Sequence, residues 1–214
     1  MDQQQSDIIA LYQDVESYST EMDAEIGSSW FQSIQKDLAS EMASRKGMII
    51  DSSCGTGHFL QAIGNLVASD VVLAGIDLSP PMLNEAKRRL GNRADLSVGN
   101  MLNMHQFPPC SAAAVISFFA IQHLDTENIH LAFKEWHRLL QNQGILILGC
   151  WQGDGAIDYG DESSLEAHLY NEEQLKSIVS AAGFNVVKST VIKQPTPGIP
   201  MNAIYLKAIK ENRG

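Results

Sequence analysis

Positive charge is scarce in this sequence: 15 lysines and arginines stand against 25 aspartates and glutamates, giving a formal net charge of −10. A protein that binds along a phosphate backbone needs a basic stripe, so we expect no nucleic-acid partner. No apolar run is long enough to span a membrane, and the first residues, MDQQQ, lack the pattern of a signal peptide. We therefore expect no membrane partner.

Cysteine and metal-site patterns are equally sparse. The 3 cysteines show no C-x-x-C spacing, which is typical of proteins of a reducing cytoplasm. The H-E-x-x-H pattern of zinc sites is absent. His123, His130 and His137 are evenly spaced, but the last two would lie about 10 Å apart along one helix. One metal ion cannot bridge that separation, so we expect a cytoplasmic protein without a metal.

The most informative stretch is MIIDSSCGTGH at residues 48–58. Three apolar residues predict a short buried strand, a carboxylate ends it, and a helix follows a loop of small residues. Glycines let a ligand approach the backbone, and the N–H groups at a helix start favour negative charge. The pattern indicates a binding site for a ligand with diol, amine and carboxylate groups.

A second predicted strand, residues 71–76, ends in Asp77. An acidic residue at this place commonly binds the hydroxyls of a ribose, and we predict that role for Asp77. The dinucleotide fingerprint is incomplete, because Leu60 stands where its third glycine would be. NAD is therefore disfavoured.

At these residues the chain resembles the class I S-adenosylmethionine-dependent methyltransferases, in the branch that acts on small molecules. The family's first motif, hhDhGCGTG with h apolar, reads IIDSSCGTG here, and Ser53 replaces its first glycine. Further matches follow in the family's order: GIDLSPPML at 75–83, HRLLQNQG at 137–144 and AGF at 182–184. Together these motifs span residues 47–187.

The resemblance implies a set of residues that bind S-adenosylmethionine. They are Tyr12, Tyr18, Asp51, Ser53, Gly55, Gly57, Asp77, Leu78, Met82, Asn100, Met101, Ser117 and Phe118. The two tyrosines could instead anchor an ordinary helix, and Leu78 and Met82 could instead be core residues. Asn100 would accept a hydrogen bond from the adenine amine through its carbonyl oxygen.

The remaining pattern predicts an α/β fold. We expect a Rossmann-like, seven-stranded, mostly parallel sheet with an antiparallel last strand and helices on both faces. Residues 1–45 should form an N-terminal helical cap, and residues 46–214 the cofactor-binding domain. Further strands are expected at 95–99, 112–119, 145–150, 186–192 and 203–209, with Thr126 capping the helix that ends at Gly144. The last two strands are separated by too few residues for a helical crossover, so they should pair antiparallel.

The acceptor pocket is expected where the fourth strand ends. We assign to it Phe119, His123, Trp151, Tyr159 and Asp161. The stretch 151–167 lacks periodicity and should form part of this pocket or its lid, unless it is simply a solvated acidic loop. His123 is a candidate general base; its alternative is a structural role at a helix start.

These residues predict methyl transfer from S-adenosylmethionine to a small-molecule acceptor. Two alternatives stay open: aminopropyl transfer on the same scaffold, and a non-catalytic partner protein that binds S-adenosylmethionine. The aminopropyl branch usually carries an acidic pair near the fourth strand, where this chain has Ser117 and Phe118. We expect a monomer or a homodimer.

Overall fold

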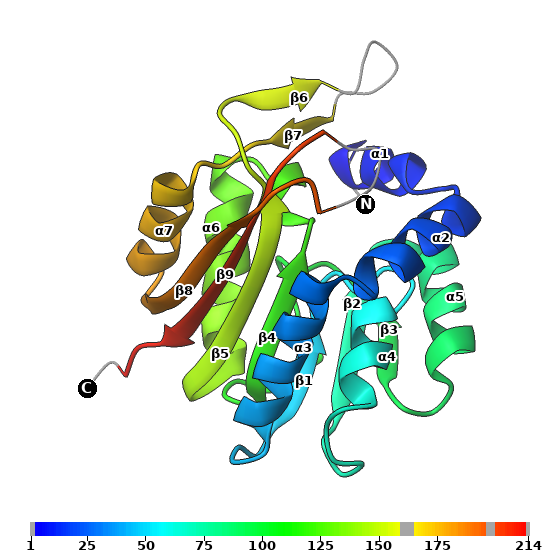
Figure 1. Cartoon of the computed structure of the whole chain (residues 1–214), viewed down its shortest axis with the longest axis vertical. Helices are drawn as coiled ribbons and strands as arrows, with labels where there is room; N and C mark the ends of the chain where they lie inside the picture. Colours follow the sequence, from blue (N-terminus) through cyan, green and yellow to red (C-terminus); the bar gives the residue numbers. More distant parts are fainter. Residues whose placement is uncertain (1–2, 159–164, 196–199, 213–214) are drawn as a thin grey trace.

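The computed structural model describes residues 3–158, 165–195 and 200–212 (Figure 1). The helices are α1 (Gln3–Leu11), α2 (Val15–Ile26), α3 (Ser29–Met42), α4 (His58–Gly64), α5 (Pro80–Leu90), α6 (Thr126–Leu139) and α7 (Glu172–Ala181), with a short 3₁₀ helix η1 (Ile121–His123). The strands are β1 (Met48–Asp51), β2 (Leu73–Asp77), β3 (Asp95–Val98), β4 (Ala112–Phe118), β5 (Leu140–Trp151), β6 (Ala156–Asp158), β7 (Glu166–His168), β8 (Phe184–Ile192) and β9 (Ala203–Lys210).

Seven of these strands form one sheet in the order β3-β2-β1-β4-β5-β9-β8. Strands β1 to β5 are parallel, and β9 is antiparallel to both of its neighbours, β5 and β8. The predicted mostly parallel sheet with an antiparallel last strand is confirmed. The strand order reverses between β1 and β4, so their carboxyl ends frame the crevice where open α/β sheets bind ligands.

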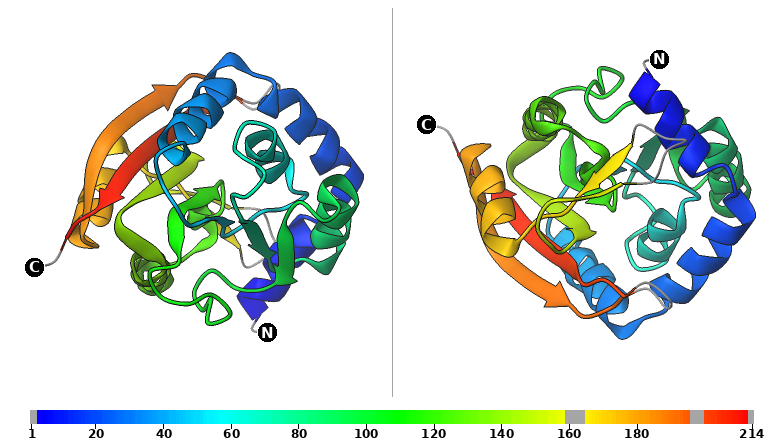
Figure 2. Two further views of the ribbon diagram at one scale, coloured as in Figure 1. Left: turned by 90° about the horizontal axis from the view of Figure 1, so that it is seen from below. Right: turned by 90° about the horizontal axis from the view of Figure 1, so that it is seen from above.

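Helices cover both faces of the sheet (Figure 2). Because successive side chains of a strand point to opposite faces, Ile49 and Ile50 belong to two different cores. Ile50 packs in the core under α6 and α7, with Phe133 and Trp136 of α6 fully buried. Ile49 packs in the core under α3, α4 and α5. Helices packed on both faces of the sheet thus support its carboxyl edge, where the crevice lies.

The N-terminal helices divide into two roles. Helix α3 packs on the sheet through Phe31, Ile34 and Leu38, so it belongs to the helical layer. Helices α1 and α2 lie beyond the carboxyl ends of the parallel strands and act as the expected cap (Figure 1). The boundary at residues 45/46 stays a prediction.

Two local predictions around α6 are wrong. Asp125, and not Thr126, is the N-cap, since its carboxylate accepts the N–H of Asn128 at 2.7 Å. The helix ends at Leu139 and β5 begins at once, well before Gly144. Gln143, the residue before the predicted stop Gly144, takes a left-handed conformation with a φ of 60°.

The stretch 151–167 is more regular than expected. It contains β6 and most of β7, which pair antiparallel as a separate two-stranded sheet. Strand β5 also runs one residue further than predicted and ends at Trp151. Trp151 is thereby placed at the carboxyl edge of the main sheet.

Candidate functional site

A cavity of about 430 Å³ opens at the carboxyl ends of the parallel strands, a size typical of small-molecule sites. Its floor comes from the segments that follow β1, β2, β3 and β4 and from the end of β5, and α1 and α2 cover it. Of the residues predicted to form the site, the following line it: Tyr12, Tyr18, Ser53, Gly55, Asp77, Leu78, Met82, Asn100, Met101, Phe118, Phe119, His123 and Trp151.

Three further predicted residues lie behind the wall of the cavity. Asp51 is 3% exposed and accepts the Ser53 N–H, and the fully buried Ser117 places its hydroxyl 3.4 Å from that of Ser53. Gly57 begins α4 against α5. These three residues thus support the loop after β1 and do not line the cavity. Tyr159 and Asp161 lie outside the described residues, so their assignment stays a prediction.

The Asp77 side chain links the end of β2 to the loop that follows β1. One carboxylate oxygen accepts the N–H of Gly55 at 2.8 Å, and the other accepts the N–H of Ser79 at 2.9 Å. Each oxygen of an ionised carboxylate can accept a further hydrogen bond. Asp77 can therefore receive two donors from a ligand, such as a ribose diol, without releasing the loop.

Two buried carboxyl groups, Asp77 in the floor of the cavity and Asp51 behind it, lie close enough to influence each other's ionisation. Burial raises the pKa of Asp51 to about 7, and the nearby Asp77 adds to this while the Ser53 N–H opposes it. Burial also raises the pKa of Asp77. A cationic ligand placed above these carboxyls would favour their ionised forms, so the site suits a ligand that carries positive charge.

The raised pKa of Asp51 predicts that the stability of the fold depends on pH. The Asp51 carboxyl of the folded chain keeps its proton up to a pH of about 7, whereas in the unfolded chain it ionises near pH 3.9. The unfolded state thus binds fewer protons between about pH 4 and 7, and stability falls as pH rises through that window. Asp51→Asn keeps the acceptor but cannot ionise. Calorimetric melting of the ligand-free protein should show a flatter fall for the variant; an unchanged slope would contradict the assignment.

Helix α1 is fastened directly to the short helix after β4. The Tyr12 hydroxyl lies 2.9 Å from His123 Nε2, and Gln4 donates to the His123 carbonyl at 2.9 Å. The ring of Tyr12 also meets that of Tyr18 edge-on at 5.7 Å. The two predicted tyrosines and His123 are thus one contact group, which closes the cavity from above.

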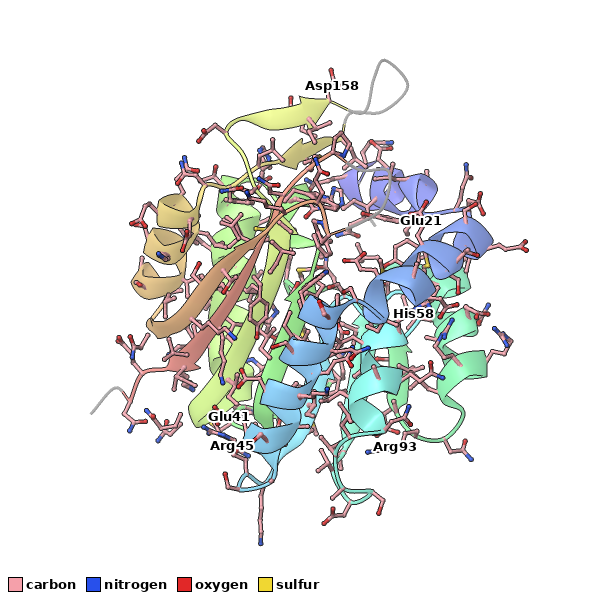
Figure 3. All side chains as sticks on the ribbon, in the orientation of Figure 1. Glu21, Glu41, Arg45, His58, Arg93 and Asp158 are labelled. Atoms are coloured by element: carbon pink, nitrogen blue, oxygen red, sulfur yellow. The ribbon has the colours of Figure 1, made fainter. Side chains whose placement is uncertain are left out.

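Helix α2 is held by a second group that the sequence did not reveal. His58, labelled in Figure 3, bonds Thr56 Oγ1 through Nδ1 at 2.7 Å and Asp23 through Nε2 at 2.9 Å. Arg89 reaches Asp23 and Ser19. Burial lowers the pKa of His58, which favours the neutral ring. These contacts tie the cap to the first turns of α4 and to α5.

Other lining residues were also missed by sequence reasoning. They include apolar residues of the cap (Ile8, Ile9, Met22), several polar and acidic residues of the cap, and polar residues near η1 (Gln122, Asn128). Asn100 lines the cavity, but its side-chain oxygen already accepts the Leu102 N–H at 2.9 Å. Only the second lone pair of that oxygen is left for the predicted adenine contact.

Within the described ranges, no group of three or more histidine, cysteine, aspartate or glutamate side chains could hold a metal ion. The helices of those ranges are also too short or too polar to cross a membrane.

The fold is that of the class I S-adenosylmethionine-dependent methyltransferases, which the sequence motifs resemble. Residues 49–144 match the family model described as "Methyltransferase domain". This match covers a little less than half of the chain.

Curated relatives match over part of the chain. Over 106 residues it is 30% identical to a carboxy-S-adenosyl-L-methionine synthase of Helicobacter pylori, covering 49% of this chain and 43% of that protein. Over 107 residues it is 26% identical to an uncharacterised methyltransferase of Geobacillus sp., covering 50% and 48%. The match thus spans less than half the length of either relative.

Solved structures match over most of the chain. The 1,6-didemethyltoxoflavin-N1-methyltransferase of Burkholderia thailandensis has a TM-score of 0.76 at 17% identity, covering 97% of this chain and 87% of that one. A methyltransferase of Methanosarcina mazei has a TM-score of 0.68 at 18% identity, covering 77% and 92%. At such low identity these likenesses establish the fold.

Proposed function

We propose that this chain binds S-adenosylmethionine in the cavity above β1, β2 and β4 and transfers its methyl group to a small molecule. The observation that carries the proposal is one cavity with two kinds of wall. Acidic strand ends around Asp77 lie on one side, and the aromatic residues Phe119 and Trp151 lie on the other. The first suits a positively charged nucleoside, and the second leaves an apolar place for an acceptor.

The relatives' printed names support this proposal. The Burkholderia enzyme was solved with 1,6-didemethyltoxoflavin and S-adenosylhomocysteine bound, and a Haemonchus contortus phosphoethanolamine methyltransferase with S-adenosyl-L-methionine. Both act on small molecules. We expect the same substrate class here, with the chain working as a monomer or a homodimer in the cytoplasm.

In this proposal Asp77 receives the ribose hydroxyls and Asn100 the adenine amine, while Leu78 and Met82 pack on the adenine. S-adenosylmethionine supplies a methyl carbon that its sulfonium makes electrophilic. The chain's task is to align the acceptor and exclude water, and such positioning can supply about 7–11 kcal/mol. The cap formed by α1 and α2 provides the exclusion.

Carboxy-S-adenosylmethionine synthesis is the second candidate, because most of the matching curated relatives bear that name. Its product carries an additional carboxylate, which needs a cation when it is removed from water. No lysine or arginine belongs to the described lining of this cavity. We therefore favour methyl transfer.

The test uses S-adenosylmethionine labelled either in its methyl group or in its methionine chain, incubated with the protein and a metabolite extract. Methyl transfer puts the methyl label in a small product and leaves the chain label in S-adenosylhomocysteine. Chain label in the product would indicate transfer of the 3-amino-3-carboxypropyl chain, and a parallel incubation with chain-labelled decarboxylated S-adenosylmethionine tests aminopropyl transfer. Methyl label retained in a carboxylated cofactor would indicate carboxy-S-adenosylmethionine synthesis. Binding without any transfer would indicate the non-catalytic partner.

His123 gives a further prediction. Burial, with a smaller contribution from His168, lowers the pKa of His123 to about 4, so the ring is neutral and weakly basic near neutral pH. A general base works best when its pKa is close to the working pH. We expect His123 to position Tyr12 and the acceptor, and His123→Gln to lower kcat by less than about tenfold, against the 10²–10⁴-fold typical of general acid–base groups. Tyr12→Phe is the matched control and should have a similar effect. A loss of kcat of about 10³-fold in His123→Gln, with unchanged cofactor affinity, would instead indicate that His123 is a general base.

A further inference from the structure

The charges around the cavity all have one sign. Its described lining contains the carboxylates Asp14, Glu21, Glu25 and Asp77, and neither lysine nor arginine. The segments 159–164 and 196–199, which lie outside the described residues, contain no lysine or arginine in their sequences either. An acceptor that brings a phosphate, or a carboxylate in addition to that of the cofactor, finds no lysine or arginine in this lining to compensate it, and such burial is costly.

Several of the basic residues that the structure describes are engaged elsewhere. Arg138 pairs with Glu135, and Lys207 pairs with Asp37 and Glu41. Arg45 and Arg93 lie at the opposite end of the molecule from Glu21, which is at the cap (Figure 3).

Arg89 reaches the cap, since it donates to Ser19 of α2. It is held there by Asp23 and by Gln61 of α4. The low pKa of His123 also leaves that ring uncharged near neutral pH. The described lining thus offers an anionic acceptor no positive partner.

The acceptor side of the cavity has a wall made of two aromatic rings that pack against each other. The rings of Phe119 and Trp151 lie 4.5 Å apart at 39°, and both side chains are partly exposed in the cavity. Phe119 holds a φ of 49°, which is rare for a bulky residue, and its N–H donates to the Gly149 carbonyl at 2.7 Å. Backbone strain of this kind clusters at ligand sites. The strained backbone of Phe119 thus orients its ring, which is part of a surface on which a flat ligand can stack.

A buried amide lies on the same segment as this wall. Gln122 is 1% exposed, lines the cavity, and its side-chain oxygen has no hydrogen-bond partner within the described ranges. A buried polar atom without a partner is costly, so a partner is expected from a ligand. A glutamine amide presents a donor beside an acceptor, which matches a ring N–H beside a ring carbonyl.

We propose that the acceptor is an uncharged, flat nitrogen heterocycle, stacked on the wall of Phe119 and Trp151 with its hydrogen-bonding edge on Gln122. This inference rests on the proposed methyl transfer. The lone pair of a ring nitrogen forms the new bond to the methyl carbon while the carbon–sulfur bond breaks with its electrons on sulfur. The proton of that nitrogen leaves to solvent.

The experiment measures probe binding to the protein saturated with S-adenosylhomocysteine. The probes are quinazolinone, which is flat and uncharged with an N–H beside a carbonyl; its ring-carboxylated derivative; naphthalene; and phosphoethanolamine. We expect quinazolinone to bind more tightly than either anionic probe by more than about tenfold. Gln122→Leu should weaken quinazolinone by about tenfold and leave naphthalene and S-adenosylhomocysteine unchanged. Gln13→Leu, at an exposed position outside the lining, is the matched control and should change nothing.

Several outcomes overturn the inference. Equal binding of the carboxylated probe, or binding of phosphoethanolamine alone, contradicts the charge argument on the wild-type protein, whether or not the variant folds. A panel in which no uncharged heterocycle binds also contradicts it. If Gln122→Leu weakens S-adenosylhomocysteine as much as quinazolinone, the amide belongs to the cofactor. If the wild-type protein does not bind S-adenosylhomocysteine in the first titration, the proposed function is contradicted, and so is this inference, which rests on it.

Discussion

Asp77→Ala should weaken binding of S-adenosylhomocysteine by about tenfold or more, because hydrogen bonds to a charged group contribute roughly 1.5–3 kcal/mol. Asp77 ends β2 at the edge of the cavity, and both of its oxygens can accept further donors. Isothermal titration of the ligand-free protein measures the loss. Asp95→Ala removes an exposed carboxylate at the start of β3 and should leave the affinity unchanged.

A second ligand separates ribose binding from loop support. Asp77 also accepts the N–H groups of Gly55 and Ser79, so its removal loosens the loop after β1 as well. The wild type should discriminate against an analogue of S-adenosylhomocysteine that lacks the ribose hydroxyls, and Asp77→Ala should lose that discrimination. This is a double-mutant cycle between one side chain and one ligand group. If the variant still discriminates as the wild type does, Asp77 does not bind the ribose.

Gly57→Ala should destabilise the fold by about 2–4 kcal/mol, the sum of a left-handed backbone cost and an overpacking cost. Gly57 has a φ of 81°, and a Cβ there would lie 2.8 Å from Leu90 Cδ1 and 3.1 Å from Ala86 Cβ. The glycine therefore lets α4 begin in close contact with α5. Denaturation in urea measures the change.

Gly155→Ala is the matched control for Gly57→Ala. Gly155 also has a φ of 81°, but a Cβ there would meet no atom of the described residues within 4 Å. It should cost only the backbone part, about 1–2 kcal/mol. Equal losses in the two variants would show that close packing at Gly57 is not required.

Short-range patterns in the sequence were sufficient for most of the fold. The capping box of Asn171 and Gln174 at the start of α7 and the Ser79 cap of α5 each join residues three positions apart. The antiparallel pairing of β8 and β9 followed from the short link between them. Each of these features depends on residues close together in the chain, which is the information that spacing carries.

Features that depend on distant residues could not be predicted. The contact of Tyr12 with His123 joins residues 111 positions apart. The burial of Gln122 and the left-handed backbone of Phe119 have no signature in composition or periodicity. At α6, Asp125 and Thr126 are adjacent residues of equally good capping type, so sequence alone could not choose between them.

A crystal structure of the protein with S-adenosylhomocysteine tests the central claim most directly. The account predicts the ribose hydroxyls on Asp77, the adenine beside Leu78 and Asn100, and the sulfur directed toward Phe119 and His123. The remaining space should lie between Gln122 and Trp151, beneath α1. A ligand bound elsewhere, or bound with its sulfur directed away from the aromatic wall, would contradict it.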